Sequence, residues 1–362
     1  VEPEGPALLR SWALSGLGAT SWALSRYREA LGYYRREAEL WRHEANPYRE
    51  APVRYNVALL ARYVRGDDEP NSPELLALFE EALRFAVQVG NRMAEGEIRL
   101  EIATFHLGEE RAVAEAEEAL AIFRSLGTRQ QEVWARLVRA MAVLRLDAGS
   151  ARESVREIEE AVEAARQLGL LLFVTRGLRA KAVAQWEGGS PQEAIASVFE
   201  ALDSAERIRN IQPEDQVRAR TFSAWSRMYT MAQHMILEAE AGEPGPEALS
   251  LAFNVSERQR ARALLDEVDA AQASRIVMES DRRHEEREGI LAEMSGIQRS
   301  LLYGRLSDEE RSALLRELEG LEEKEARLRG QMAESDWTFR ALRQPAIPSL
   351  PQVQRSLRPD QA

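Results

Sequence analysis

The stretch AEEALAIFRSLG, residues 116–127, predicts the fold more clearly than any other part of the chain. An acidic pair precedes an alanine, apolar residues recur at three- and four-residue spacing, and a glycine ends the run. Residues at this spacing share one face of a helix, and glycine readily takes the left-handed conformation that stops a helix. The same order recurs in FEEALRFAVQVG at 79–90 and IEEAVEAARQLG at 158–169. We therefore predict three equivalent amphipathic helices.

Turn residues on either side of these helices form two alternating sets. The sets are Gly90, Gly127, Gly169 and Asn210, and Gly66, Gly108, Gly149 and Gly189. Within each set the spacing is about 37 to 42 residues, so one period holds a helix, a turn, a second helix and another turn. We predict six helix pairs near 6–46, 47–91, 92–127, 128–169, 170–210 and 211–270. Ser190 and Ser307, each followed three residues later by a glutamate, predict helix N-caps.

The helices that carry the EEAL pattern resemble those of tetratricopeptide (TPR) repeats. The TPR period is about 34 residues, and the longer period here leaves HEAT-like helix pairs as the alternative. The resemblance implies an all-α, right-handed α-α superhelix over 1–270, in which the first helix of each pair lines a concave surface. We expect five tryptophans to pack between its helices, namely Trp12, Trp41, Trp134, Trp186 and Trp225.

A heptad pattern replaces the repeats over 271–340. Apolar residues follow 4-3-4 spacing at Ile290, Met294, Ile297 and Leu301 and again from Leu314 to Met332, where Glu325 interrupts the pattern. Gly304 and Ser307 lie between the two runs, where a turn is expected. This pattern predicts a long antiparallel helical hairpin with coiled-coil packing. The remaining segment, 341–362, contains four prolines and is predicted to be a linker.

The order of features near the end of the chain suggests a family. The stretch ALSLAFNVSERQRARALLDEV, 248–268, is followed by the predicted hairpin and then by LPQVQRSLRPDQA at 350–362. This order resembles the region that precedes the protease domain of CHAT proteins, the caspase-like family associated with TPRs. The resemblance implies a CHAT domain in cis beyond residue 362.

Three arginines of the 248–268 stretch cannot all face a helical core. Arg258, Arg260 and Arg262 combine an apolar stem with a planar group that binds carboxylates in a bidentate manner. One interpretation is that they join the last array helix to acidic groups of the hairpin. The other interpretation is that they bind the adjoining catalytic domain. Both interpretations place the three arginines at a domain junction.

Charge divides between the two helices of each pair. In pairs two to five the first helices taken together carry net positive charge, although 92–108 alone is slightly negative, and the second helices carry net negative charge. We therefore predict a basic concave groove that binds an acidic protein or peptide segment. The candidate binding residues are Arg54, Asn56, Arg62, Arg99, Arg136, Arg139, Arg176 and Arg179. Asn56 matches an asparagine that peptide-binding TPRs place on the ligand backbone. The alternative is that these arginines pair with glutamates of neighbouring second helices.

The sequence contains no recognised motif for catalysis, metal binding or cofactor binding. It contains no cysteine, so a thiol nucleophile and a thiolate metal site are both excluded. The four histidines match no metal-binding motif, and no phosphate-binding glycine loop or nucleophile elbow is present. We therefore expect no catalytic residue, metal or cofactor. The net charge of −12 argues against nucleic-acid binding, no run is long and apolar enough for a membrane span, and we expect a cytoplasmic protein.

Two functions fit these observations. The first is a regulatory, substrate-recruiting TPR module of a CHAT-family cysteine protease. The second is a stand-alone TPR adaptor or a peptide-sensing regulator. A cysteine- and histidine-bearing domain in the same reading frame would favour the first.

Overall fold

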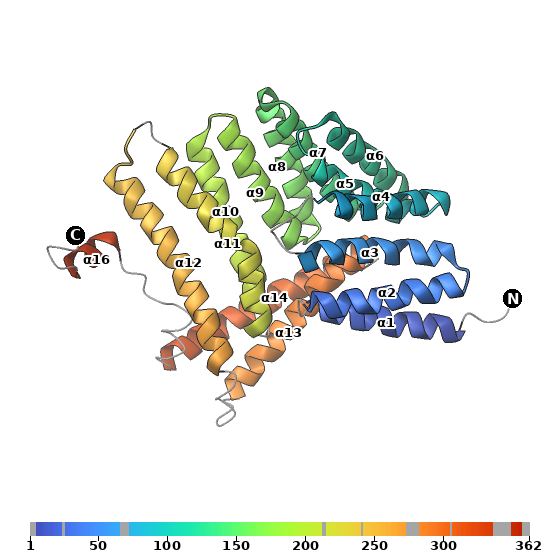
Figure 1. Cartoon of the computed structure of the whole chain (residues 1–362). Helices are drawn as coiled ribbons and strands as arrows, with labels where there is room; N and C mark the ends of the chain where they lie inside the picture. The colour runs from blue at the N-terminus through green and yellow to red at the C-terminus, as the bar shows by residue number, and fades with distance from the viewer. Residues whose placement is uncertain are drawn as a thin grey trace. The chain divides into compact units, whose positions relative to one another are not determined.

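The computed structural model describes residues 5–23, 26–65, 72–211, 215–239, 242–272, 282–304, 306–335 and 349–356. These residues form helices and turns, and no strand occurs among them, so the predicted all-α class is confirmed (Figure 1). Twelve helices of the described part fall into the six predicted pairs. They are α1 (Gly5–Ala23), α2 (Tyr27–His43), α3 (Pro47–Arg65), α4 (Pro73–Gln88), α5 (Arg92–Phe105), α6 (Glu110–Leu126), α7 (Arg129–Leu146), α8 (Ala151–Gln167), α9 (Leu171–Glu187), α10 (Pro191–Asn210), α11 (Asp215–Glu238) and α12 (Pro246–Gln272).

The contacts divide the chain into two compact units, Val1–Glu157 and Ile158–Ala362. In the first unit each helix from α1 to α7 packs against its neighbour in sequence. In the second unit α9 to α12 do the same, and two further helices, α13 (Arg282–Tyr303) and α14 (Asp308–Ser335), pack against each other. The predicted hairpin therefore forms, and it belongs to the unit that also holds the last helix pairs.

The predicted glycine stops have the expected backbone. Gly90, Gly127 and Gly169 have φ values of 70°, 66° and 70°, which is the left-handed region that an L side chain enters only at a cost. Each of the three helices that precede these glycines buries several alanines and larger apolar residues on one face, among them Phe79 and Phe123, whose side chains are completely buried. Hydrophobic burial on one helix face thus creates each helix, and glycine ends it.

A proline inside α3 is compensated from another helix pair. Pro52 has no N–H to donate, so the carbonyl of Tyr48 lacks its usual helical partner. The Nδ2 of Asn91 donates to this carbonyl oxygen at 3.1 Å. The Oδ1 of the same side chain accepts from the N–H of Ala94 at 3.1 Å and caps α5. One buried asparagine therefore satisfies two backbone groups and connects the second helix pair to the third.

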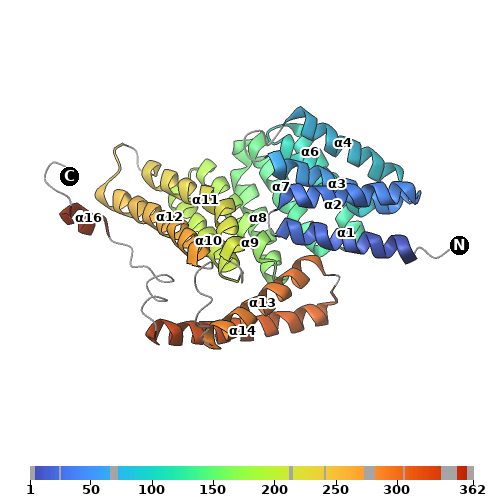
Figure 2. The ribbon, with the colours of Figure 1, turned by 60° about the horizontal axis from the view of Figure 1, so that its bottom comes forward.

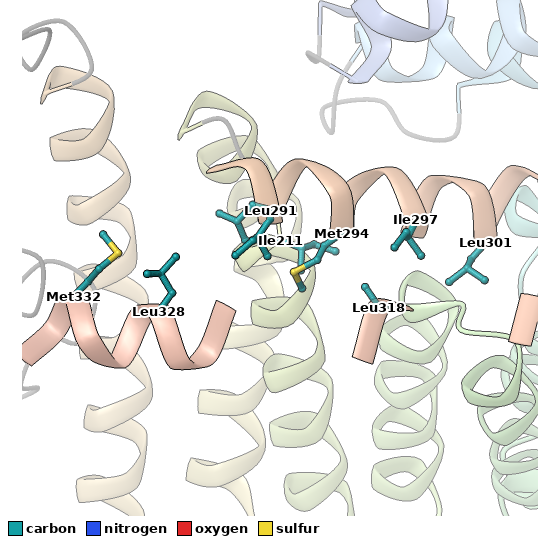
Figure 3. Packing of buried hydrophobic residues seen from close by; sticks show 9 residues of the cluster. Ile211, Leu291, Met294, Ile297, Leu301, Leu318, Leu328 and Met332 are labelled. Carbon is teal, nitrogen blue, oxygen red and sulfur yellow. The ribbon is translucent and has the colours of Figure 1, made fainter. Parts of the chain in front are cut away.

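The hairpin core contains most of the predicted heptad residues. Figure 3 shows Leu291, Met294, Ile297 and Leu301 of α13 along one face, with Leu318, Leu328 and Met332 from α14. Ser307 caps α14 as predicted, because its Oγ accepts from the N–H of Glu310 at 3.2 Å while the Glu310 carboxylate accepts from the N–H of Ser307 at 2.8 Å. The hydrogen bonds that the N–H and the Oγ of Ser307 donate to the Glu310 carboxylate lower the pKa of Glu310.

The hairpin lies across the ends of helices in its own unit (Figure 2). Ile211, which follows α10, belongs to the hairpin core and lies beside Leu291 and Met294 (Figure 3). Arg311 of α14 is buried, and its Nη1 donates to the carbonyl of Leu168 at 2.7 Å and to that of Leu301 at 3.3 Å. Both carbonyls lie at or near helix C-termini, where no intrahelical N–H is available. The arginine thus bridges the end of α8 and the end of α13.

Two local predictions are wrong, and a third segment contains a helix that the sequence did not predict. Trp12 is 63% exposed, although Trp41 is buried as expected. Ser190 precedes α10 but its side chain makes no capping hydrogen bond, and the Glu193 carboxylate accepts from the Nε2 of Gln185 at 3.4 Å. The segment predicted as a linker includes a helix, α16 (Leu350–Ser356), and Ser349 precedes it with its N–H and Oγ both directed to the Oε1 of Gln352. The rest of 341–362 lies outside the described residues.

Candidate ligand-binding surface

The predicted binding arginines of the first unit are mostly paired with carboxylates. Arg54 contacts Glu50 and Glu81, each at 2.9 Å, and its guanidinium lies 4.2 Å from the centre of the Phe85 ring. Arg62 reaches across to Glu101 of α5 at 2.9 Å. Two of these acids, Glu81 and Glu101, come from neighbouring helices, so each ion pair also joins helices. These arginines have a structural function before any ligand arrives.

Arg99 and Arg139 are also paired with glutamates, including glutamates of neighbouring helices. Arg99 binds Glu95 of its own helix at 3.2 Å and Glu115 of α6 at 2.6 Å. Burial lowers the pKa of Arg99, but the hydrogen bonds and charges of the two glutamates outweigh it and raise the pKa. Arg139 lies 3.1 Å from Glu157 and 3.6 Å from Glu117. Pairing with second-helix glutamates is the alternative that the sequence left open, and the structure shows it for Arg54, Arg99 and Arg139.

Two predicted residues of the first unit make no ion pair or hydrogen bond to a described residue. Arg136 is half-buried on α7, and its positive charge acts on Glu157 from beyond ion-pair distance. Asn56 is half-buried on α3. Both remain accessible on the first helices, where the sequence placed the binding groove, and their role in binding stays a prediction.

An acidic side chain that the sequence did not single out lies on α5. Glu97 is half-buried and has no ion pair or hydrogen bond to any residue in the described part of the chain. Burial, together with the charge of Glu101 one helical turn away, raises the pKa of Glu97 to about 7. The first helices of the first unit therefore present an acid that is only partly ionised at neutral pH, and their surface is not uniformly basic.

Stability of the first unit is expected to fall as the pH rises through this range. The folded protein holds the Glu97 proton up to about pH 7, whereas the unfolded chain releases it near pH 4.5, so folding is favoured by the protonated state and weakened as pH rises. The variant Glu97→Gln should unfold at higher urea than the wild type at about pH 8, by about 1–2 kcal/mol, and lose this advantage near pH 5. A constant difference across the pH range would contradict the assignment.

Three arginines of the second unit lie on the first helices of pairs five and six. Arg176 and Arg179 lie on α9, three residues apart and so on one face of the helix, and Arg227 lies on α11. Arg179 is exposed and makes no ion pair or hydrogen bond to the described residues. Partial desolvation of its guanidinium by surrounding protein atoms, and then the positive charges of Arg176 and Arg227, lower the pKa of Arg179. We call Arg176, Arg179 and Arg227 the arginine cluster.

The lysine of the same helix behaves differently. Lys181 binds Glu159 of α8 at 2.8 Å, which is the neutralised arrangement found for the arginines of the first unit. Sequence reasoning identified Arg176 and Arg179 but missed Arg227, because charges were compared only in pairs two to five. Extending that comparison to the first helix of pair six would have found it.

Two of the predicted junction arginines, Arg258 and Arg260, make no ion pair with the described residues of the hairpin. Arg258 lies 3.6 Å from Asp203 of α10, and Arg260 pairs with Glu257 of its own helix at 2.8 Å. The side chain of Arg262 lies outside the described residues. An ion pair between the hairpin and the array exists elsewhere, between Arg207 of α10 and Glu322 of α14 at 3.1 Å.

The described residues form neither a metal site nor a membrane span. His43, His106 and His234 each lie near a single glutamate, and no group of three metal-binding side chains occurs in this part of the chain. Among the described helices, none combines the length and the apolar character needed to cross a bilayer. A scan against protein-family models finds no match, and a search of the curated proteins finds no significant match.

Proposed function

We propose that the chain is a protein-binding module of the TPR kind that captures an acidic segment of another protein on its first helices. Arg179 carries this proposal. Its exposed side chain makes no ion pair to a described residue, whereas Arg54, Arg99 and Arg139 are each paired with a carboxylate. A carboxylate from a ligand would provide this pairing through charge-assisted, bidentate hydrogen bonds.

We further propose that the module recruits substrates and regulates a CHAT-family cysteine protease domain in cis. This step rests on the resemblance of 248–362 to the region that precedes such domains. The arrangement of the second unit is compatible with it, because the arginine cluster and the hairpin belong to the same compact unit. A ligand held on α9 and α11 would therefore act on the body that also contains α13 and α14.

The proposal is tested by selecting from a random 12-residue peptide library on the immobilised chain. Enriched peptides should be rich in Asp and Glu, and their affinity should fall as salt is added, since exposed charge contacts are screened. Arg179→Glu should weaken them at least about tenfold. Arg166→Glu is the matched control, because Arg166 is a similarly exposed arginine on α8 that already pairs with Glu200. Enrichment without acidic residues, or equal loss in both variants, would refute the proposal.

A further inference from the structure

We propose that the outer face of α1 is a docking surface for a second copy of this chain, with the two α1 helices antiparallel about a twofold axis at Ala13. The outer face is exposed and consists of Leu9, Arg10, Ala13, Gly16 and Leu17, with Trp12 at its edge. The inference goes beyond the proposed function and does not rest on it, because none of the candidate ligand-binding residues lies on α1.

The packing of α1 on α2 fixes which face points outward. α1 lies at one end of the helix stack of the first unit and packs against α2 (Figures 1 and 2). The hydroxyls of Ser11 and Ser15 each donate to the carboxylate of Glu37 on α2 at 2.7 Å. Gly18 lies against the ring of Tyr34, also on α2. Rotation of α1 to bury its outer face would break these contacts, so the face stays exposed unless another molecule covers it.

Large apolar side chains are exposed on this fixed helix. Leu9 and Trp12 are each 63% exposed, and Leu17 is 49% exposed. Arg10 is the only charged residue of Gly5–Ala23, and nothing lies within 4 Å of the position that a Cβ of Gly16 would take. The terminal helix of a repeat array needs a polar outer side to remain soluble, so this composition indicates an interaction surface.

The charge of α1 favours a second copy over an acidic or basic partner. The chain has a net charge of −12, so two copies repel each other over most of their surface. Because α1 contains no acidic residue, two copies can meet here without placing carboxylates together. A strongly charged partner would find a single arginine to pair with and would bury its other charges against leucine and tryptophan, which costs free energy.

The order of residues about Ala13 makes the face complementary to itself. Leu9 and Leu17 lie four residues before and after Ala13, so the three share one side of the helix. In an isologous antiparallel contact, Leu9 of each copy meets Leu17 of the other, and the two copies of Ala13 meet at the axis. Arg10 then faces Gly16, whereas a parallel pairing would bring the two arginines together. The small residues at the crossing let the helices approach closely enough for the leucines to interdigitate.

Sedimentation equilibrium of the full chain tests the proposal. It should show a monomer–dimer equilibrium with a Kd of about 1–100 µM, because one helix face forms a smaller contact than a permanent dimer has. Added salt should preserve or tighten the dimer, since it screens the repulsion between acidic chains. Leu9→Glu should raise the Kd at least about tenfold and leave the urea unfolding midpoint unchanged. Leu78→Glu is the matched control, because Leu78 is a 38% exposed leucine of α4 in the same unit.

The absence of cysteine from the chain allows a test of the geometry. Ala13→Cys should give a disulfide-linked dimer on oxidation, since the twofold axis brings the two thiols together, whereas Leu78→Cys should cross-link far more slowly. A dimer that tolerates Leu9→Glu, with equal cross-linking of the two cysteine variants, uses another surface and overturns the proposal. A chain that stays monomeric at every concentration also overturns it and leaves the outer face of α1 to a different occupant.

Discussion

Replacing Gly169 by alanine is expected to destabilise the second unit by about 2–4 kcal/mol. Two effects add at this position. The backbone φ of +70° disfavours any L side chain, and a Cβ would lie 2.5 Å from Leu315 Cδ2 and 3.0 Å from Leu301 Cδ1. Leucine ends can move in an open site, but Leu301 is completely buried in the hairpin core. The strain should therefore spread into the packing of α13 and α14.

Gly127→Ala is the matched control for this prediction. Gly127 has a φ of +66° and no atom within 4 Å of its would-be Cβ, so only the backbone cost of about 1–2 kcal/mol applies. Urea unfolding followed by circular dichroism gives the two losses, and hydrogen exchange shows whether α13 and α14 become less protected. If both variants lose the same stability, steric contact of the added Cβ with Leu301 and Leu315 does not contribute to the loss.

Replacing Glu325 by alanine should cost about 3 kcal/mol. Glu325 interrupts the heptad pattern of α14, and its Oε1 accepts from the Nε of Arg287 on α13 at 2.9 Å. The two side chains are only 9% and 12% exposed. Removal of the carboxylate takes this ion pair away from a positive charge that has little access to water, and this causes most of the loss. Thermal unfolding of the two proteins measures it.

The double variant Arg287→Met, Glu325→Leu tests the reason for that loss. Apolar residues in place of both charges should recover most of the stability or exceed the wild type, because a buried ion pair is commonly no better than an apolar contact of similar volume. A double variant as unstable as Glu325→Ala would show that the pair itself holds the hairpin together. The single change Arg287→Met should be destabilising as well, since it leaves Glu325 with only Arg329 at 3.7 Å.

Helix pairing could be predicted because its causes are local. Apolar spacing and glycine stops located the twelve array helices to within a few residues, and the heptad pattern located α13 and α14. The helix α16 was missed although Ser349 and Gln352 have the spacing of a capping box, because prolines dominated the interpretation of that segment. The exposed position of Trp12 depends on which helix faces are covered, and apolar spacing alone does not determine this.

The candidate site was predictable only in part, since its character depends on contacts between distant residues. Net charge placed Arg54, Arg99 and Arg139 on the correct helices, but their glutamate partners lie 16 to 27 residues away along the chain. Summed charge does not reveal such pairing. The unpaired state of Arg179 and the raised pKa of Glu97 likewise follow from the surroundings that the fold creates.

The contact of Gly169 with Leu301 and Leu315 also constrains how this sequence can evolve. The turn after α8 and the hairpin meet so closely that a larger residue at position 169 requires smaller ones at 301 or 315. Arg311 adds a second constraint, because its hydrogen bond to the carbonyl of Leu168 depends on where that turn ends. Among homologous chains we therefore expect coordinated changes at these positions, and a hairpin transplanted from a distant homologue should fit only if it brings a compatible turn with it.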